Sequence, residues 1–235
     1  MATEMLIAER VADVRARIAT ACLKAGRMPS QVRLLPVSKT QPVTAIRALW
    51  QATGITRFAE NKVQELVAKE TAFGSDSPLT WALIGHLQTN KTRAAAVVSS
   101  EFQALDSLRV AAALDRRLQE LGRTLEVLVE VNSSGEESKW GLPASAVAAF
   151  AEEVTTYPRL VVRGLMTVAA AETARAAQSF YLMAELQESL LRSGVPGQWS
   201  ELSMGMSADF ETAISYGATC VRIGAAIFGE RNYSG

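Results

Sequence analysis

The stretch RLLPVSKTQPVTAIRALWQA, residues 33–52, contains the unit from which most of the chain is built. The short apolar run at 33–37 predicts a strand, the polar residues 38–40 predict a turn, and the periodic stretch 43–52 predicts a helix. A strand followed directly by a helix is typical of sheets in which neighbouring strands run parallel.

The same unit recurs along the chain. We expect eight strands, at 33–37, 57–60, 80–84, 101–105, 125–131, 160–166, 199–202 and 220–223. Helices are expected between them, at 43–52, 63–73, 91–98, 108–121, 144–154, 173–191 and 209–216. Eight such units in 235 residues predict an α/β fold, a closed (β/α)8 barrel of TIM type. The alternative is a doubly wound open sheet, but no glycine-rich dinucleotide fingerprint follows the first predicted strand.

A helix is expected before the first unit. Apolar residues recur every three or four positions from Ile7 to Cys22, which places them on one face of a helix, and Gly26 and Pro29 mark its end. We therefore expect a leading helix within residues 1–28 and the barrel within 33–224, as one domain over 1–235. Little sequence follows the last predicted strand, so no second domain is expected there.

Composition excludes several classes of protein. Twenty-four basic residues balance 24 acidic ones, so the net charge is zero and we expect no nucleic-acid partner, which would require clustered positive charge. No apolar run reaches the roughly 18 residues of a membrane span, and Glu4 and Glu9 lie where a signal peptide is apolar. We expect a cytoplasmic protein without membrane association. Cys22 and Cys220 lack metal or redox spacing and are expected to be buried thiols.

In a TIM barrel the functional residues lie in the loops that follow the strands. Lys39 follows the first predicted strand. Burial of its stem would disfavour the ammonium form and make the amine a nucleophile toward an aldehyde; the alternative is a solvated loop lysine. The loops at 203–207 and 222–226 are rich in small residues, and barrels commonly bind phosphate with the loops after strands seven and eight. The alternative is that these glycines serve turn geometry alone.

Other polar residues after the predicted strands have ordinary interpretations. Asn61 is placed to cap a helix or to contact a bound ring, and Met166 to lie in the core or beside that ring. His86 is the one histidine and has no cluster of ligating residues around it, so we expect a rim residue and no metal site. Glu136 and Glu137 are expected to be solvated.

Seven segments, in order and over nearly the whole chain, resemble the pyridoxal phosphate homeostasis protein family. They are 36–40 (PVSKT), 58–65 (FAENKVQE), 84–91 (IGHLQTNK), 137–139 (ESK), 163–166 (RGLM), 202–207 (LSMGMS) and 221–224 (VRIG). The resemblance implies the alanine-racemase-like barrel of fold type III pyridoxal phosphate proteins, with pyridoxal 5'-phosphate as cofactor. The implied function is cofactor homeostasis, meaning buffering, protection or delivery of the cofactor to apo-enzymes.

The resemblance also implies roles for individual residues. Lys39 matches the lysine that forms the Schiff base with the cofactor, and Arg222 matches the arginine that faces the pyridine nitrogen. Six further residues match cofactor-contacting positions: Asn61, Met166 and Met204 beside the ring, and Ser203, Gly224 and Ala225 in the phosphate-binding loops. Because arginine keeps its proton, Arg222 would leave the ring nitrogen unprotonated and the cofactor a weak electron sink.

Three residues depart from the family pattern. Gln41 stands in place of a second lysine, Ala59 in place of a glycine and Ala225 in place of a threonine. Loss of the threonine hydroxyl removes one phosphate contact but leaves the backbone amide, so we expect weaker or rearranged phosphate binding. Gln41 weakens the expectation that a nearby second amine assists cofactor transfer.

Two enzyme functions remain as alternatives. One is an amino-acid racemase-like reaction with Lys139 or His86 as the second acid, since racemisation needs proton donors on both faces of the substrate and Lys39 supplies only one. The other is a phosphosugar barrel enzyme that uses the same phosphate loops. We favour a monomeric cofactor-binding protein without dedicated catalytic turnover.

Overall fold

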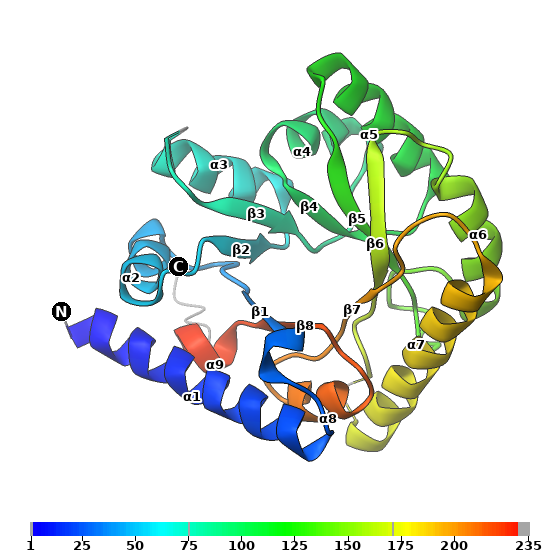
Figure 1. The fold of residues 1–235 in the computed structure, drawn as a ribbon. Helices are drawn as coiled ribbons and strands as arrows, with labels where there is room; N and C mark the ends of the chain where they lie inside the picture. The colour runs from blue at the N-terminus through cyan, green and yellow to red at the C-terminus, as the bar shows by residue number, and fades with distance from the viewer. Residues whose placement is uncertain (1, 75, 171, 230–235) are drawn as a thin grey trace.

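Eight short strands form one parallel sheet in the computed structural model, which describes residues 2–74, 76–170 and 172–229 (Figure 1). The strands are β1 (Arg33–Pro36), β2 (Arg57–Glu60), β3 (Thr80–Leu83), β4 (Glu101–Leu105), β5 (Leu125–Glu130), β6 (Leu160–Met166), β7 (Glu201–Ser203) and β8 (Cys220–Ile223). Their order in the sheet is β1-β8-β7-β6-β5-β4-β3-β2, and every pair in that order is parallel.

The two ends of this order, β1 and β2, also meet. Val37, directly after β1, forms a parallel bridge with Ala59 of β2, and the amide of Ser38 donates to the carbonyl oxygen of Ala59 at 2.9 Å. The sheet therefore closes on itself, which confirms the predicted barrel and excludes the open doubly wound sheet.

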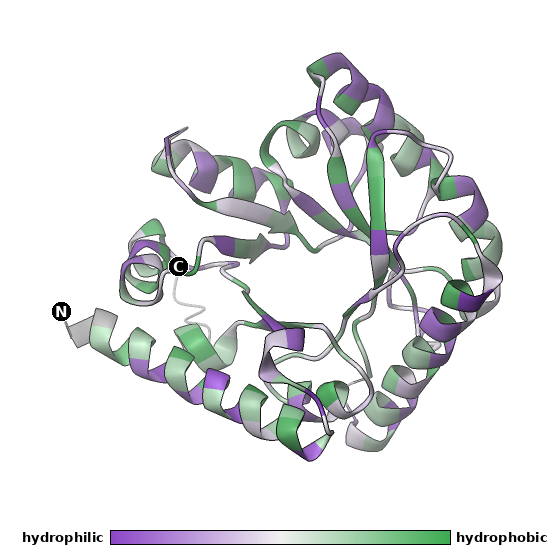
Figure 2. Cartoon of the chain, in the orientation of Figure 1, coloured by the Kyte–Doolittle hydropathy of each residue, from purple (hydrophilic) through white to green (hydrophobic). Residues whose placement is uncertain are grey.

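The helices surround the ring of strands, as Figure 1 shows. They are α1 (Ala2–Lys24), α2 (Val43–Thr53), α3 (Val63–Phe73), α4 (Thr92–Val98), α5 (Leu108–Leu121), α6 (Val147–Val154), α7 (Thr173–Ser193), α8 (Phe210–Ser215) and α9 (Ala225–Phe228). Hydrophilic and hydrophobic residues alternate along α1 and α7 in Figure 2, as expected of amphipathic helices that cover a sheet.

The leading helix is confirmed. Its apolar stripe from Ile7 to Cys22 is buried, and α1 packs against α2, α8 and α9 on the outside of the barrel (Figure 1). Cys22 and Cys220 are both free thiols and both fully buried, as expected from the sequence. Within the described part of the chain, no helix has the length and hydrophobicity needed to cross a membrane.

The structure differs from the sequence prediction at two places. The strand expected at 199–202 is β7 at Glu201–Ser203, because Trp199 has a φ of +43° and its indole N–H donates to the carbonyl oxygen of Pro196 at 3.0 Å, which holds it in a turn. The short helix α9 (Ala225–Phe228), directly after β8, was not predicted.

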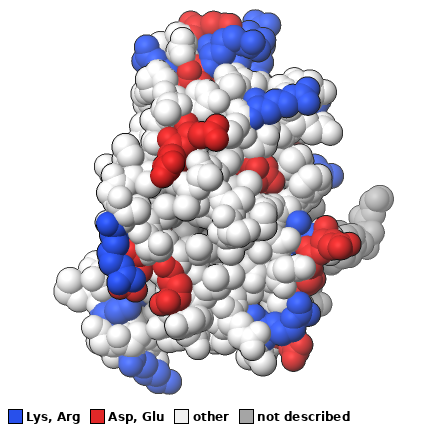
Figure 3. All heavy atoms as spheres, turned by 90° about the vertical axis from the view of Figure 1, so that its right-hand side faces the viewer, with Lys and Arg blue, Asp and Glu red and all other residues white. Residues whose placement is uncertain are grey.

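Charged residues at the strand starts fill the amino-terminal end of the barrel. Arg33 of β1 forms a two-bond ion pair with Glu101 of β4, at 2.9 and 3.0 Å, and also contacts Glu201 of β7. Arg57 of β2 approaches the same Glu101 at 2.9 Å. Since the amino ends of parallel strands meet at one end of a barrel, these residues close that end to ligands. The outer face of the molecule on the side of α6 and α7 carries both signs of charge interspersed, as Figure 3 shows.

The shared carboxylate, Glu101, has a side chain only 1% exposed. Burial alone raises the pKa of this carboxyl, but the hydrogen bonds and charge of Arg33, helped by Gln103 and Arg57, outweigh burial and lower the pKa below its usual value. As the pH falls through about 4.5, the unfolded chain therefore takes up a proton at Glu101 before the folded protein does. The folded protein loses stability over that pH range.

We predict that Glu101→Gln lowers the free energy of unfolding by about 2–4 kcal/mol near neutral pH, because Arg33 and Arg57 lose their shared anion in a buried site. The variant should also lose less stability than the wild type as the pH falls from 5 to 3. Urea unfolding across this pH range measures both effects.

Glu188→Gln is the matched control, since Glu188 forms an exposed ion pair with Arg192 on α7. Its urea midpoint should equal that of the wild type. Equal stability of Glu101→Gln and wild type would contradict a stabilising role for the ion pairs.

Candidate functional site

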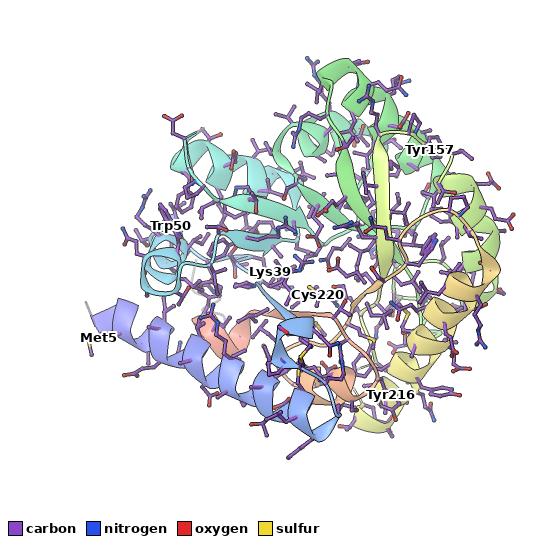
Figure 4. All side chains as sticks on the ribbon, in the orientation of Figure 1. Met5, Lys39, Trp50, Tyr157, Tyr216 and Cys220 are labelled. Atoms are coloured by element: carbon purple, nitrogen blue, oxygen red, sulfur yellow. The ribbon has the colours of Figure 1, made fainter. Side chains whose placement is uncertain are left out.

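A cavity of about 350 Å³ lies at the carboxyl ends of the strands, opposite the ion pairs. Its lining comes from the segments after β1, β2, β3, β6, β7 and β8: Val37, Lys39, Gln41, Asn61, Ile84, Val168, Met206, Ser207, Ala208, Arg222, Gly224, Ala225 and Gly229. Figure 4 shows Lys39 and Cys220 in the middle of the ring of strands, with Trp50, Tyr157 and Tyr216 toward the outside. This is the end at which TIM barrels hold their functional sites.

Lys39 lies in a tight turn directly after β1. The amide of Gln41 donates to the carbonyl oxygen of Ser38 at 2.9 Å, which closes a four-residue turn around Lys39 and Thr40. Thr40 has a φ of +64°, in the left-handed region that a β-branched residue enters at a cost of about 1–3 kcal/mol. Surrounding contacts must therefore hold this turn. The Lys39 side chain is half-buried.

Arg222 of β8 forms the floor of the cavity, with only 3% of its surface exposed. Its guanidinium donates to the hydroxyl of Ser203 at 2.8 Å and to the carbonyl oxygen of Thr167 at 2.7 Å, both of them neutral acceptors. Burial lowers the pKa of Arg222, but arginine starts so high that it keeps its charge. A buried cation held by neutral partners gives the cavity a positive floor.

Asn61 reaches the cavity from the loop after β2 because its neighbour in the next loop is a glycine. A Cβ atom at Gly85 would lie 2.2 Å from the carbonyl oxygen of Asn61 and 2.4 Å from its side-chain oxygen. The contact that places Asn61 therefore requires glycine at position 85.

The loops after β7 and β8 are joined to each other. The amide of Arg222 donates to the carbonyl oxygen of Gly205 at 3.0 Å, and the amide of Ala226 donates to the hydroxyl of Ser207 at 3.3 Å. Gly205 has a φ of +93°, and a Cβ there would lie 2.7 Å from the Cβ of Ala213 in α8. The two loops thus form one small-residue edge of the cavity, where phosphate groups bind in this fold.

The lining is suited to an anionic, partly apolar ligand. Lys39 and Arg222 supply positive charge, Asn61 and Ser207 supply hydrogen-bonding groups, and no carboxylate belongs to the lining among the residues that the structure describes. Ile84, Val168 and Met206 supply apolar surface for a ring. A cavity of about 350 Å³ lies in the range that small ligands occupy. A phosphorylated aromatic aldehyde fits this set of groups.

Comparison with known proteins agrees with this geometry. The family described as alanine racemase, N-terminal domain, matches residues 13–232. A pyridoxal phosphate homeostasis protein of Pseudomonas aeruginosa is 43% identical over 227 residues, which cover 97% of this chain and 96% of that protein. The chain belongs to the pyridoxal phosphate homeostasis protein family.

Solved structures support the family and the fold. PipY of Synechococcus elongatus with pyridoxal phosphate bound is 34% identical, with a TM-score of 0.80, and the match covers 95% of this chain and all (100%) of that one. An alanine racemase of Clostridium difficile is 15% identical with a TM-score of 0.72, which shows a common fold. The match to that racemase covers 97% of this chain and 58% of the racemase chain.

The structure brings five of the eight predicted site residues into the cavity lining: Lys39, Asn61, Arg222, Gly224 and Ala225. The other three, Met166, Ser203 and Met204, are fully buried outside it. Ser203 donates to the side-chain oxygen of Gln103 at 2.7 Å and accepts from Arg222, so its observed contact is with the arginine. The contacts with the cofactor that the family resemblance implies for all eight residues stay a prediction.

Sequence analysis did not single out Ser207 or Met206, which line the cavity from the loop after β7. That loop was predicted as a phosphate loop, and a serine shortly before a helix is the signal that could have identified Ser207. Of the residues that departed from the family pattern, Gln41 and Ala225 line the cavity, and Ala59 lies in the apolar interior of the barrel.

His86 and Lys139, the two candidates for a second acid, have other contacts. The His86 ring stacks on the Trp140 ring with centroids 3.7 Å apart. The Lys139 ammonium donates to the carbonyl oxygen of Ala169 at 2.9 Å and pairs with Glu136 at 3.2 Å, so Glu136 is part of an ion pair. Neither residue belongs to the lining of the described cavity. Among the described residues, no group of histidine, cysteine or carboxylate side chains could hold a metal ion.

One buried carboxyl near the site was not predicted to matter. Glu130 ends β5 and is only 6% exposed, and one of its oxygens has no hydrogen-bond partner within the described chain. Burial, with the charge of Asp106, raises the pKa of Glu130 to about 7 against the opposing charge of Arg222. Between about pH 4.5 and 7 the folded protein therefore binds more protons than the unfolded chain, and stability falls as the pH rises.

We predict that Glu130→Gln stabilises the protein by about 1–3 kcal/mol at pH 8 and changes stability little at pH 5, because the neutral amide removes the cost of a buried charge. Urea unfolding at both pH values measures this. Glu137→Gln, at an exposed residue in the loop after β5, should keep the pH dependence of the wild type. A wild-type protein whose stability is the same at pH 5 and pH 8, with Glu130→Gln parallel to it, would contradict the assignment.

Proposed function

We propose that this chain binds pyridoxal 5'-phosphate in the cavity at the carboxyl end of the barrel and acts in cofactor homeostasis, by buffering, protecting or delivering the cofactor. The observation that carries the proposal is the meeting of Lys39, Arg222 and the joined loops after β7 and β8 in one cavity. These groups come from opposite ends of the sequence, and the closed barrel gathers them.

Lys39 is the residue we assign to covalent capture. Pyridoxal phosphate, when bound, supplies an aldehyde that condenses with a primary amine. Lys39 is the lysine in the described cavity lining, which it shares with the apolar residues Val37 and Ile84 and with Arg222.

Arg222 and the loops are assigned to orientation. Arg222, held from below by Ser203 and the carbonyl of Thr167, can donate to a ring nitrogen but cannot give up its proton. Ser207, Gly224 and Ala225 form the edge assigned to the phosphate. Ala225 offers only its backbone there, so we expect weaker anchoring than a hydroxyl would provide.

Two features favour a carrier over a racemase. His86 and Lys139 are engaged outside the cavity, as described above. The mouth is open, with Val168 38% and Met206 37% exposed, so a bound ligand can be exchanged with solvent or passed to a partner. The partners we propose are apo-enzymes that require the cofactor. We propose that the protein acts as a monomer in the cytoplasm, since proteins of that reducing compartment keep their thiols free, as Cys22 and Cys220 are.

The first test is the ultraviolet and visible spectrum of the protein mixed with pyridoxal 5'-phosphate. We expect an absorbance band of the amine–aldehyde link that borohydride reduction removes. Peptide mass spectrometry of the reduced protein should then find the cofactor attached to Lys39. Lys39→Ala should abolish the band and the adduct.

Lys62→Ala is the matched control, because Lys62 is exposed and follows the cavity residue Asn61 in the same loop. It should leave the band and the adduct unchanged. A wild-type protein that takes up no cofactor, or an adduct on a lysine other than Lys39, would overturn the proposal.

A second test separates carrier from racemase. We expect no steady incorporation of solvent deuterium at Cα when the loaded protein is incubated in D2O with single enantiomers of amino acids, followed by NMR. Sustained exchange with many turnovers per protein molecule would identify an enzyme.

A further inference from the structure

A buried polar cluster lies directly behind the turn that carries Lys39. Its members are Ser38 in that turn, Glu60 at the end of β2, and Glu65 and Lys69 on α3. Glu65 and Lys69 lie four residues apart, so both side chains project from one face of α3. Neither belongs to the lining of the described cavity, and the proposed function gives them no role.

Lys69 uses all of its hydrogen-bonding capacity in this cluster. The residue is 5% exposed, and its ammonium donates to the carbonyl oxygen of Ser38 at 2.7 Å, to Glu60 at 2.6 Å and to Glu65 at 2.8 Å. An ammonium has three N–H donors, so each has one acceptor. A lysine bound in this way is a fixed cation rather than a nucleophile.

The contacts of the cluster hold the backbone on both sides of Lys39. The peptide group before Lys39 is held through the carbonyl oxygen of Ser38, which accepts from Lys69. The peptide group after Lys39 is held through the amide of Thr40, which donates to the Glu65 carboxylate at 2.6 Å. The second contact also secures the left-handed conformation of Thr40.

We infer that Glu65 and Lys69 are positioning residues that clamp the two peptide groups flanking Lys39 and thereby set where its amine enters the cavity. A lysine side chain has a long flexible stem, so rotation of its backbone would displace the amine by far more than the contact distance a reaction needs. Glu60 supports the clamp, since it accepts from both Lys69 and the Ser38 hydroxyl at 2.6 Å. The effect on the rate of reaction with the cofactor rests on the proposed role of Lys39, whereas the effect on the backbone of the turn does not.

Glu65 is the residue to change first, because it is partly exposed, at 26% of its side chain, and its loss leaves Lys69 paired with Glu60. We expect Glu65→Ala to react with pyridoxal 5'-phosphate about tenfold more slowly than the wild type, measured as the initial rate of the absorbance change. The expected factor corresponds to one charge-assisted hydrogen bond. Glu65→Gln keeps an acceptor oxygen and should recover the rate to within about threefold.

Hydrogen exchange of the Thr40 amide, followed by NMR without any cofactor, is the structural readout. Glu65→Ala should speed this exchange about tenfold, and Glu65→Gln should largely restore protection. Gln64→Ala, at the exposed neighbouring position on α3, is the matched control and should change neither the exchange nor the reaction rate. Urea unfolding checks that each variant is folded, and Glu65→Asp, which is too short to span both partners, replaces Glu65→Ala if the latter does not fold.

The outcomes distinguish this inference from the proposed function. A wild-type protein that does not react with the cofactor removes the proposed function, while Thr40 exchange still tests the clamp. Wild-type exchange and wild-type reaction rate in Glu65→Ala would overturn the clamp even if the cofactor binds. The role of Lys69 is tested with the double variant Lys69→Met and Glu60→Gln, which leaves neither partner as a lone buried charge. We expect this variant to react about tenfold more slowly than the wild type. A wild-type rate would exclude Lys69 from the clamp.

Discussion

The parallel bridge between Val37 and Ala59, with its hydrogen bond from the amide of Ser38 to the carbonyl oxygen of Ala59, joins the first strand to the second and closes an eight-stranded sheet into a ring. The pairing of β1 with β8 in this ring brings the loop after β1 beside the loop after β8, although the two lie at opposite ends of the sequence. The cavity depends on this meeting, because Lys39 and Arg222 line it from those two strands. This hydrogen bond also lies one residue from Lys39, so the contact that closes the barrel also fixes the backbone next to that amine.

The buried charges are paired with each other at the amino end of the barrel interior but not at its carboxyl end. At the amino end, arginines and glutamates neutralise each other in direct contact, so these residues offer little unpaired charge to a ligand. At the carboxyl end, the acceptors of Arg222 among the described residues are neutral, and Glu130 has an oxygen without a hydrogen-bond partner there. Unbalanced charge in a buried site is costly to stability and is typical of sites that bind ligands. The polarity of the barrel thus follows from where its charges are paired.

The alternation of apolar runs and periodic stretches predicted every strand to within a few residues, because the hydrophobic pattern of each strand and helix is a local property of the sequence. Lys39, Arg222 and the loop after β8 could be placed at the site once the strands were known, since the fold puts strand ends together. The contact of Ser203 with Arg222 and the cluster of Glu60, Glu65 and Lys69 could not be predicted. The contact between Ser203 and Arg222 spans 19 positions, and the contacts of Glu60, Glu65 and Lys69 with the turn around Lys39 span 22, 25 and 31 positions. These contacts depend on the direction in which each side chain turns, which spacing in sequence does not report.

Both cysteines of the chain are buried, Cys22 on the inward face of the leading helix and Cys220 in the barrel interior beside the cavity floor. Their thiols are therefore shielded from modifying reagents while the protein is folded. A cysteine introduced at an exposed rim residue such as Met206 would be the one readily labelled thiol, and a fluorophore attached there would report the arrival and departure of a ligand at the mouth without mutation of the native pair.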